Sequence, residues 1–172
     1  MNIRYLGILL VVGLAFADEP PSWHPFTVTS ENGKSQASVA PVTDTTYQLK
    51  VERMGRKNLL NGTQVWKTKW KRTYEYDGYT GGLVTNSGRY FVYVDEWYSE
   101  EKGIVFVYSC KKNILKYKGD VFVKDKAILE KGASHFLWLS REKRPKIKYD
   151  HGQEILVITT LDEKEHEVVL GK

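Results

Sequence analysis

The sequence predicts a mainly β, single-domain protein, built as an antiparallel sandwich, an open barrel or a blade-like meander with one short helix. Three observations lead to this fold class. Residues 65–76 alternate between two kinds of side chain, and residues 89–95 and 103–110 are apolar on both faces. Turn residues also separate short apolar runs at spacings of about ten residues, as is typical of all-β domains.

The first predicted hairpin follows a proline-rich lead-in at residues 18–25. Residues 27–29 and 34–39 have strand character, and the Ser-Glu-Asn-Gly sequence between them is typical of a turn. Residues 47–51 are a further short strand, and residues 54–62 are predicted to form a loop.

Residues 65–76 show the cleanest alternation in the chain. Because side chains of a strand point alternately to its two faces, a strand separates these residues into two sets. One face would carry Trp66, Thr68, Trp70, Arg72, Tyr74 and Tyr76, and the other Val65, Lys67, Lys69, Lys71, Thr73 and Glu75. The pattern predicts one long strand, buried on its aromatic face and wet on the other.

Two apolar strands are predicted at the centre of the protein. After a short strand at residues 83–85 and a turn at 86–88, residues 89–95 and 103–110 are apolar on both faces, which indicates strands covered on two sides. The connection at residues 97–102 is short enough to join them as antiparallel neighbours. Residues 114–117 and 121–123 are predicted to continue the meander.

The one predicted helical turn spans residues 125–131, with Asp125 as its cap and Gly132 at its end. Residues 136–139 precede a basic loop, and closing strands are expected at residues 146–149, 155–161 and 167–170, with a turn at 150–152. A weak internal echo is also present, since residues 28–34 and 84–89 both place a turn glycine before a basic residue. Either the chain contains a repeat, or two ordinary hairpins share turn chemistry.

The amino terminus predicts a cleavable signal peptide over residues 1–17. Arg4 precedes an apolar stretch of about ten residues, and Ala15-Phe16-Ala17 puts small residues where a signal peptidase requires them. The stretch is too short for a spanning helix. We therefore expect a secreted or periplasmic protein, with residues 18–172 as its single domain and no stable membrane insertion after cleavage.

Charge and cysteine content narrow the function classes further. The formal charge is +5 for the whole chain and falls to +4 when the segment carrying Arg4 is removed. This modest surplus is interleaved with acids, so we interpret the surface as mixed and solvated and expect no nucleic-acid partner. Cys110 is the single cysteine, which excludes an internal disulfide, and its place at the end of an apolar strand predicts a buried thiol.

Residues 84–139 carry a resemblance. The run Asn86 to Tyr98, then Val105 to Tyr108, then Ser134 to Trp138 is similar to an uncharacterised group of secreted bacterial β-rich proteins, whose pattern is S-x-D/N-G-R/K-Y, D-x-W and V-x-Y. Residues 30–34 resemble an earlier S-x-N-G-K turn of the same group. Here a serine separates Asn86 from Gly88, which departs from the pattern. The resemblance implies an exported β domain and carries no established activity or site residues.

No familiar catalytic or cofactor motif occurs in the sequence. It lacks a phosphate loop, a zinc-protease helix motif, a redox cysteine pair and a nucleophile elbow, and its four histidines have no metal-ligand spacing. We therefore predict no cofactor, no metal site and no assigned catalytic residue.

Candidate ligand-binding residues come from the end of a central strand. Asp95 and Glu96 are strand-end carboxylates, and Trp97 and Tyr98 follow them on the connecting loop. Aromatic side chains flanked by acids can stack a sugar or dock a protein. The alternatives are that Asp95 caps a turn and that Trp97 folds back over the sheet end.

Two classes of function follow from this sequence. The first is an exported, non-catalytic β domain that binds a protein, glycan or envelope component. The second is a small hydrolase that uses strand-end carboxylates, with Glu75 and Asp77 as further candidates beside Asp95 and Glu96. A flat surface with exposed tryptophans favours binding, whereas a cleft with two facing carboxylates favours hydrolysis.

Overall fold

The computed structural model describes residues 25–43, 46–55, 58–71, 82–111, 114–132 and 135–171. The predicted signal peptide, His24, Glu75 and Asp77 lie outside these residues. Within them the chain is mainly β, as predicted, and its strands form four antiparallel sheets. None of these sheets closes into a barrel among the described strands.

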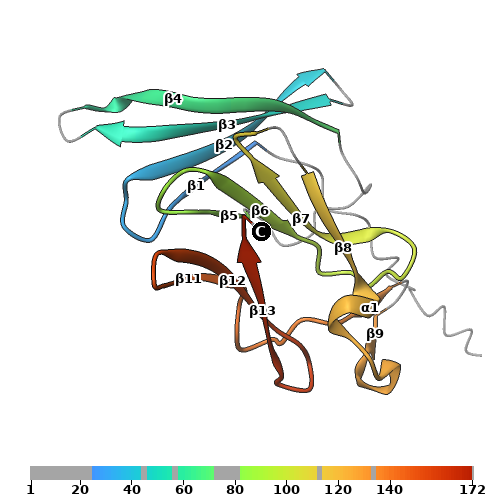
Figure 1. The fold of residues 1–172 in the computed structure, drawn as a ribbon. Coiled ribbons are helices and arrows are strands. Elements are labelled where there is room, and N and C mark those ends of the chain that lie inside the picture. The colour runs from blue at the N-terminus through green and yellow to red at the C-terminus, as the bar shows by residue number, and fades with distance from the viewer. Residues whose placement is uncertain are drawn as a thin grey trace, which may run out of the picture.

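The first sheet is a four-stranded meander of β1 (Phe26–Thr29), β2 (Ser35–Thr43), β3 (Thr46–Gly55) and β4 (Asn58–Lys71), paired in chain order (Figure 1). The loop predicted at residues 54–62 is wrong, because β3 and β4 pair down to Gly55 and Asn58. The predicted alternation holds in the described part of β4. Trp66 is buried, whereas Val65, Lys67 and Lys69 are exposed.

The second sheet is a meander of β5 (Leu83–Val84), β6 (Tyr90–Val94), β7 (Gly103–Ser109) and β8 (Ile114–Lys118). The predicted central pair is confirmed. β6 and β7 are antiparallel neighbours with Tyr93 opposite Phe106, and the buried side chains of both point to both faces of the sheet. Cys110 is exposed, and so the prediction of a buried thiol is wrong: β7 ends at Ser109 and Cys110 stands in the following turn.

The third meander closes the chain with β11 (Lys146–Asp150), β12 (Gln153–Thr159) and β13 (Glu165–Leu170). The predicted turn between β11 and β12 is confirmed, with positive φ at His151 (45°) and Gly152 (78°). Positive φ at both central residues gives a two-residue turn whose twist matches that of the two strands it joins. A small sheet of β9 (Glu130–Lys131) and β10 (Phe136–Leu137) precedes this meander.

The helical segments differ from the prediction. Residues 121–123 are not a strand, because α1 (Gly119–Phe122) takes their place. Of the helix predicted at 125–131, a 3-10 turn η1 (Lys126–Ile128) forms, and the Asp125 side chain caps it by accepting from the Ala127 N–H at 2.9 Å. It stops before Glu130 because β9 pairs there with β10.

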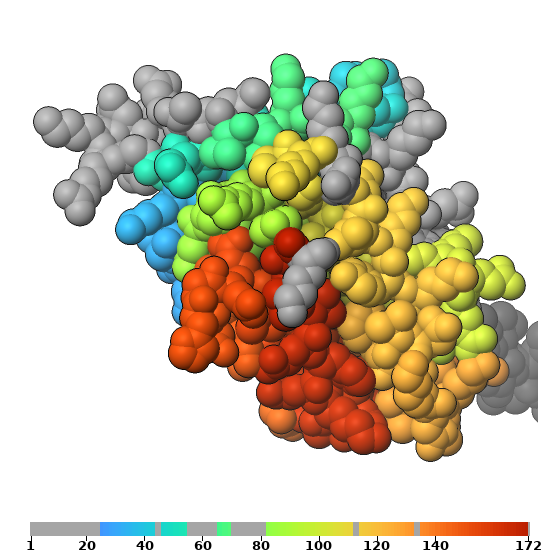
Figure 2. Space-filling view, viewed as in Figure 1, coloured from blue at the N-terminus to red at the C-terminus, as the bar shows by residue number. Residues whose placement is uncertain are grey.

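The three meanders are stacked, and the second lies between the first and the third (Figures 1 and 2). One core joins the first two meanders: Ala37, Val39, Tyr47, Leu49, Val51, Trp66, Val84, Phe91, Tyr93, Phe106 and Tyr108. The other joins the second meander to α1, Trp138 and the third: Val92, Val94, Ile104, Val105, Val107, Phe122, Val123, Trp138, Leu156, Ile158 and Leu170. Alternate residues of β6 and β7 therefore belong to different cores, which explains their apolar character on both faces.

The outer face of the third meander carries both apolar and charged side chains. Ile155 and Val157 of β12 point away from the second core, yet they are 4% and 3% exposed. Lys148 of β11 and Glu167 of β13 form an ion pair across β12. Lys148 is the strand partner of Ile155 and Glu167 that of Val157, so the ion pair lies on the same face of the sheet as the two apolar residues.

The two turns of the internal echo have the same backbone geometry. In each, the glycine N–H donates to the carbonyl three residues earlier, from Gly33 to Ser30 at 2.8 Å and from Gly88 to Thr85 at 2.9 Å. The glycines have φ of 68° and 69°. Each turn follows the first strand of a four-stranded meander, so the echo extends from turn chemistry to the order of the strands.

Candidate functional site

Residues 95–98 begin the connection from β6 to β7, and their side chains separate into two groups. Asp95 is buried, whereas Glu96 is exposed. Trp97 and Tyr98 are both half-buried. Strand pairing fixes this segment on two sides, because the Asp95 N–H donates to the Ile104 carbonyl at 2.7 Å and Trp97 forms a β-bridge with Leu137.

Asp95 supports the segment from inside. Its Oδ1 accepts from the Trp97 N–H at 2.9 Å, and its main-chain carbonyl accepts from Trp138 Nε1 at 2.7 Å. Its Oδ2 is buried without a hydrogen-bond partner among the described residues. Burial raises the pKa of this carboxyl to about 7, the Trp97 hydrogen bond opposes that rise, and the charge of Glu96 adds to it. The geometry is that of the turn cap considered from the sequence.

Tyr98 packs toward the second core. Its N–H donates to the Phe136 carbonyl at 2.8 Å, and its ring lies against Gly119, where an added Cβ would be 2.3 Å from Tyr98 Cε2. The hydroxyl donates to Glu100 Oε1 at 3.2 Å. Burial and this hydrogen bond raise the pKa of Tyr98 to about 12. Tyr98 thus stays a neutral hydrogen-bond donor at ordinary pH.

Trp97 stacks on His135, the residue directly before β10. The ring centroids of Trp97 and His135 are 3.8 Å apart and the ring planes differ by 12°. One face of the indole is therefore covered by the protein itself. The fold brings this aromatic pair beside Leu137, which forms the next part of the site.

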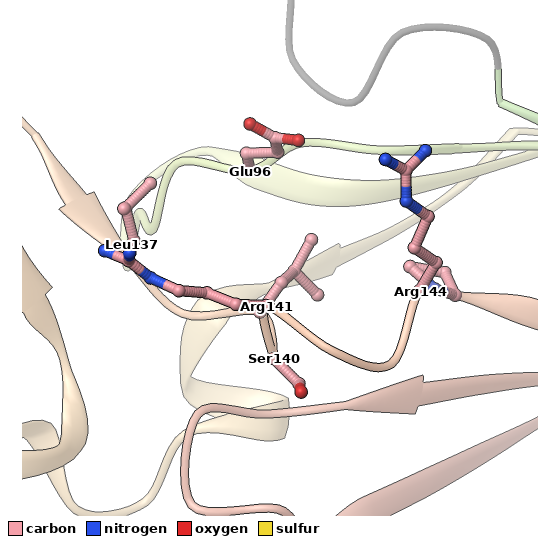
Figure 3. Close-up of a pocket in the computed structure, with 7 residues that line it drawn as sticks. Glu96, Leu137, Ser140, Arg141 and Arg144 are labelled. Carbon is pink, nitrogen blue, oxygen red and sulfur yellow. The ribbon is translucent and has the colours of Figure 1, made fainter.

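Glu96 lines a pocket of about 370 Å³. The other described lining residues come from β10 and the loop after it: Leu137, Leu139, Ser140, Arg141, Arg144 and Pro145. In Figure 3, Glu96 extends from the β6–β7 connection, and both arginines extend from the loop opposite. We name this feature the Glu96 pocket. Within the described part of the chain, Glu96 forms no ion pair.

Ser140 shapes the loop of the Glu96 pocket. Its hydroxyl oxygen accepts from the N–H groups of Glu142 and Lys143 at 3.3 and 3.2 Å, and the hydroxyl donates to Glu163 Oε1 at 2.8 Å. Lys143 pairs with Glu163 at 2.9 Å, which directs Lys143 away from the pocket lining. Arg141 pairs with Glu130, and both side chains stay largely exposed.

Of the four residues predicted to bind ligand, Glu96 lines this pocket and Trp97 lies next to it through Leu137. Asp95 holds the segment through its hydrogen bonds to Trp97 and Trp138, and Tyr98 holds it by packing against Gly119. The residues of β10 and the following loop were not predicted from the sequence. Residues 141–148 are rich in basic side chains, but nothing in that run indicates that the loop lies opposite Glu96.

Two further hollows lie away from this segment. A hollow of about 700 Å³ is lined by Arg89, Tyr90, Cys110 and Lys111 among others, and one of about 490 Å³ adjoins it beside Tyr149. Neither contains a residue of the 95–98 segment.

The described residues bring together no group of three or more histidine, cysteine or acidic side chains that would suit a metal ion. In the same part of the chain, every helix is too short and too polar to cross a membrane.

Comparisons of the chain with protein-family models, curated proteins and solved structures found no match. The resemblance to secreted bacterial β-rich proteins therefore stays a prediction. Support for a function comes from the geometry of the Glu96 pocket.

Proposed function

We propose that this chain is an exported, non-catalytic β domain that binds a protein, glycan or envelope component through the Glu96 pocket. One observation carries the proposal. The fold places an exposed carboxylate and two arginines around the aliphatic side chains of Leu137 and Leu139, and Leu139 also packs against the second core. A small number of polar groups around an apolar concavity is the usual composition of a ligand site.

The hydrolase alternative receives less support from the same geometry. Glycosidases with a carboxylate pair need both groups on the substrate. Asp95 has the raised pKa expected of a general acid, but its side chain is 1% exposed and does not line the pocket. Among the described lining residues, Glu96 is the one carboxylate.

Export is the second part of the proposal, and it rests on the signal-peptide pattern of residues 1–17. It places the pocket where extracellular proteins, glycans and envelope components are available. We propose no nucleic-acid partner, because the modest positive charge is interleaved with acids.

The test separates binding from turnover with two variants. The purified protein is applied to arrays of defined peptides and glycans, and the same compounds are followed for hydrolysis. We expect Glu96→Gln and Trp97→Ala to weaken retention of the compounds bound by the wild type several-fold, with no turnover by any form. Glu101→Gln is the matched control, because this exposed carboxylate on the same connection does not line the pocket. Hydrolysis by the wild type that disappears in Glu96→Gln would replace the binding proposal with the hydrolase.

A further inference from the structure

We infer that the Glu96 pocket takes a short peptide segment in which a carboxylate adjoins an apolar side chain. This inference rests on the proposed binding function and names its ligand class. Three features of the pocket carry it: the floor, the arrangement of charges, and the way the surrounding backbone is already paired.

The floor of the pocket is aliphatic. Leu137 and Leu139 are half-buried and Pro145 is buried, so their positions are fixed by packing. All three contribute hydrocarbon to the pocket lining. A volume of about 370 Å³ lies at the small end of ligand pockets, which limits the bound segment to a few groups. An apolar side chain of the ligand would remove both its own surface and this floor from water.

The cations select a carboxylate. A guanidinium group is planar and matches the two oxygens of a carboxylate with paired N–H donors. Arg141 already binds such a group in Glu130, and the pair is exposed, with side chains 68% and 47% accessible. Exposed pairs of this kind contribute little, so a ligand carboxylate can replace Glu130 without a large penalty. Arg144 provides the second guanidinium of the lining.

Glu96 refines that choice. A ligand that is anionic throughout, such as a sulfated or phosphorylated sugar, would place negative charge against this carboxylate. A peptide avoids the conflict, because its amide N–H groups can donate to Glu96 while its carboxylate meets one of the two arginines, whose side chains extend in different directions from the opposite loop (Figure 3).

The neighbouring backbone argues for recognition by side chains. β10 is paired on both edges, with β9 through Phe136 and Lys131 and with the 95–98 segment through Trp97 and Leu137. Leu139 forms a bridge with Thr160. A ligand therefore cannot add as a strand here. One face of the Trp97 indole is stacked on His135, which leaves less aromatic surface for a sugar and favours a peptide over a glycan.

The carboxylate can come from a chain terminus or from an acidic side chain, and three probes distinguish these sources. They are acetyl-Gly-Gly-Leu with a free carboxylate, its carboxamide, and acetyl-Gly-Glu-Leu carboxamide. NMR titration of the purified protein follows the amide signals of residues 137–144 and gives an affinity for each probe. We expect saturable shifts confined to the pocket for at least one acidic probe, and at least tenfold weaker binding of the neutral carboxamide.

Variants locate the contact. Arg144→Gln should weaken binding of the acidic probe at least tenfold, whereas Arg89→Gln, an exposed arginine in a separate hollow, should leave it unchanged. Replacing the probe's leucine with glycine should weaken binding through loss of the floor contact. Circular dichroism confirms that each variant is folded.

The outcomes separate the two proposals. Binding of the free acid alone assigns a chain terminus, and binding of the internal-glutamate probe assigns a side chain. If no acidic probe binds while a glycan is retained by the wild type and lost in Glu96→Gln, the peptide inference is overturned and the binding function stands. Equal binding of the acid and its neutral carboxamide would also overturn it.

Discussion

Asp95 combines two properties that normally exclude each other, since it is an acidic side chain and it is almost completely buried. One oxygen has a hydrogen bond, and the other has none among the described residues. Protonation resolves this situation, because a neutral carboxyl loses much less by leaving water. Burial thus favours the protonated carboxyl and raises the pKa of Asp95 to about 7.

The first prediction concerns the pH dependence of stability. The pKa of Asp95 rises from 3.8 unfolded to about 7 folded, so the unfolded chain ionises first as the pH increases. Its contribution to stability is therefore complete below about pH 4 and lost between pH 4 and 7, by about 4 kcal/mol. Urea unfolding of the wild type and Asp95→Asn should show a stability difference that shifts in favour of Asn over this range and is flat above pH 8.

Glu101→Gln is the control for that experiment, because this exposed carboxylate lies on the same connection and is not among the groups that raise the pKa of Asp95. Its stability relative to the wild type should change little from pH 4 to 8. A difference between Asp95→Asn and the wild type that stays constant over the whole range would contradict the assignment of Asp95 as a buried acid.

Much at the scale of single residues was not predictable from the sequence. A strand-end Asp followed by Trp is compatible with an exposed ligand group and with a buried cap. The choice depends on Trp138, which donates to the Asp95 carbonyl from a distant segment. The exposure of Cys110 likewise depends on where β7 stops, and an apolar pattern does not mark the last paired residue.

At the scale of the elements, the two echoed turns offer a matched pair of glycines. Gly33 and Gly88 have the same φ, but an added Cβ at Gly33 meets nothing within 4 Å, whereas at Gly88 it would lie 3.0 Å from Ser35 Oγ. Ser35 donates to the Asn86 carbonyl at 3.1 Å, so it cannot move freely.

We therefore predict that Gly33→Ala costs about 1–2 kcal/mol, from the left-handed backbone alone. Gly88→Ala should cost about 1 kcal/mol more, because the Ser35 hydrogen bond is disturbed as well. Denaturant unfolding measures both. Gly152→Ala, at a positive φ in open space, is the control and should match Gly33→Ala. Equal costs for Gly33 and Gly88 would show that the contact with Ser35 is unimportant.

Strands were predictable where the pattern is long and the turn chemistry is clear. The pair at residues 89–95 and 103–110 could be placed because both runs are apolar on both faces, which a strand between two cores requires. Errors arose where tertiary pairing decides. Residues 54–62 contain glycine and polar side chains typical of a loop, yet residues 54–55 extend β3 and residues 58–62 extend β4. The helix expected at 125–131 is cut short by the pairing of β9.

At the scale of the whole molecule, stability depends on the middle meander, which contributes to both cores. Val105 is 0% exposed in the second core. Val105→Asp should unfold the protein, because an unpaired buried charge costs several kcal/mol against a total stability of roughly 5–15 kcal/mol. Val65→Asp is the matched control, since Val65 is 40% exposed, and its melting temperature should change little. A folded Val105→Asp variant with unchanged melting would contradict this assignment.

Export is the other prediction at this scale. Cleavage after Ala17 should give a mature protein that begins at Asp18, because the residues before it have the charge, length and small side chains of a signal peptide. Intact-mass measurement on the protein from the culture medium or periplasm checks this directly. A chain that retains Met1 in the cytoplasm would refute both the cleavage and the location.

The ion pair of Lys148 and Glu167 has a consequence for how many layers the molecule can have. Sheets that stack face to face form a series with no inherent end, and each new layer needs an apolar face to rest on. Here the outermost face carries the ion pair of Lys148 and Glu167 beside Ile155 and Val157, so it presents charge where a further layer would need an apolar face. Replacing Lys148 and Glu167 by alanine should leave the two cores unchanged. It should expose an apolar surface on which a second copy of the protein can pack.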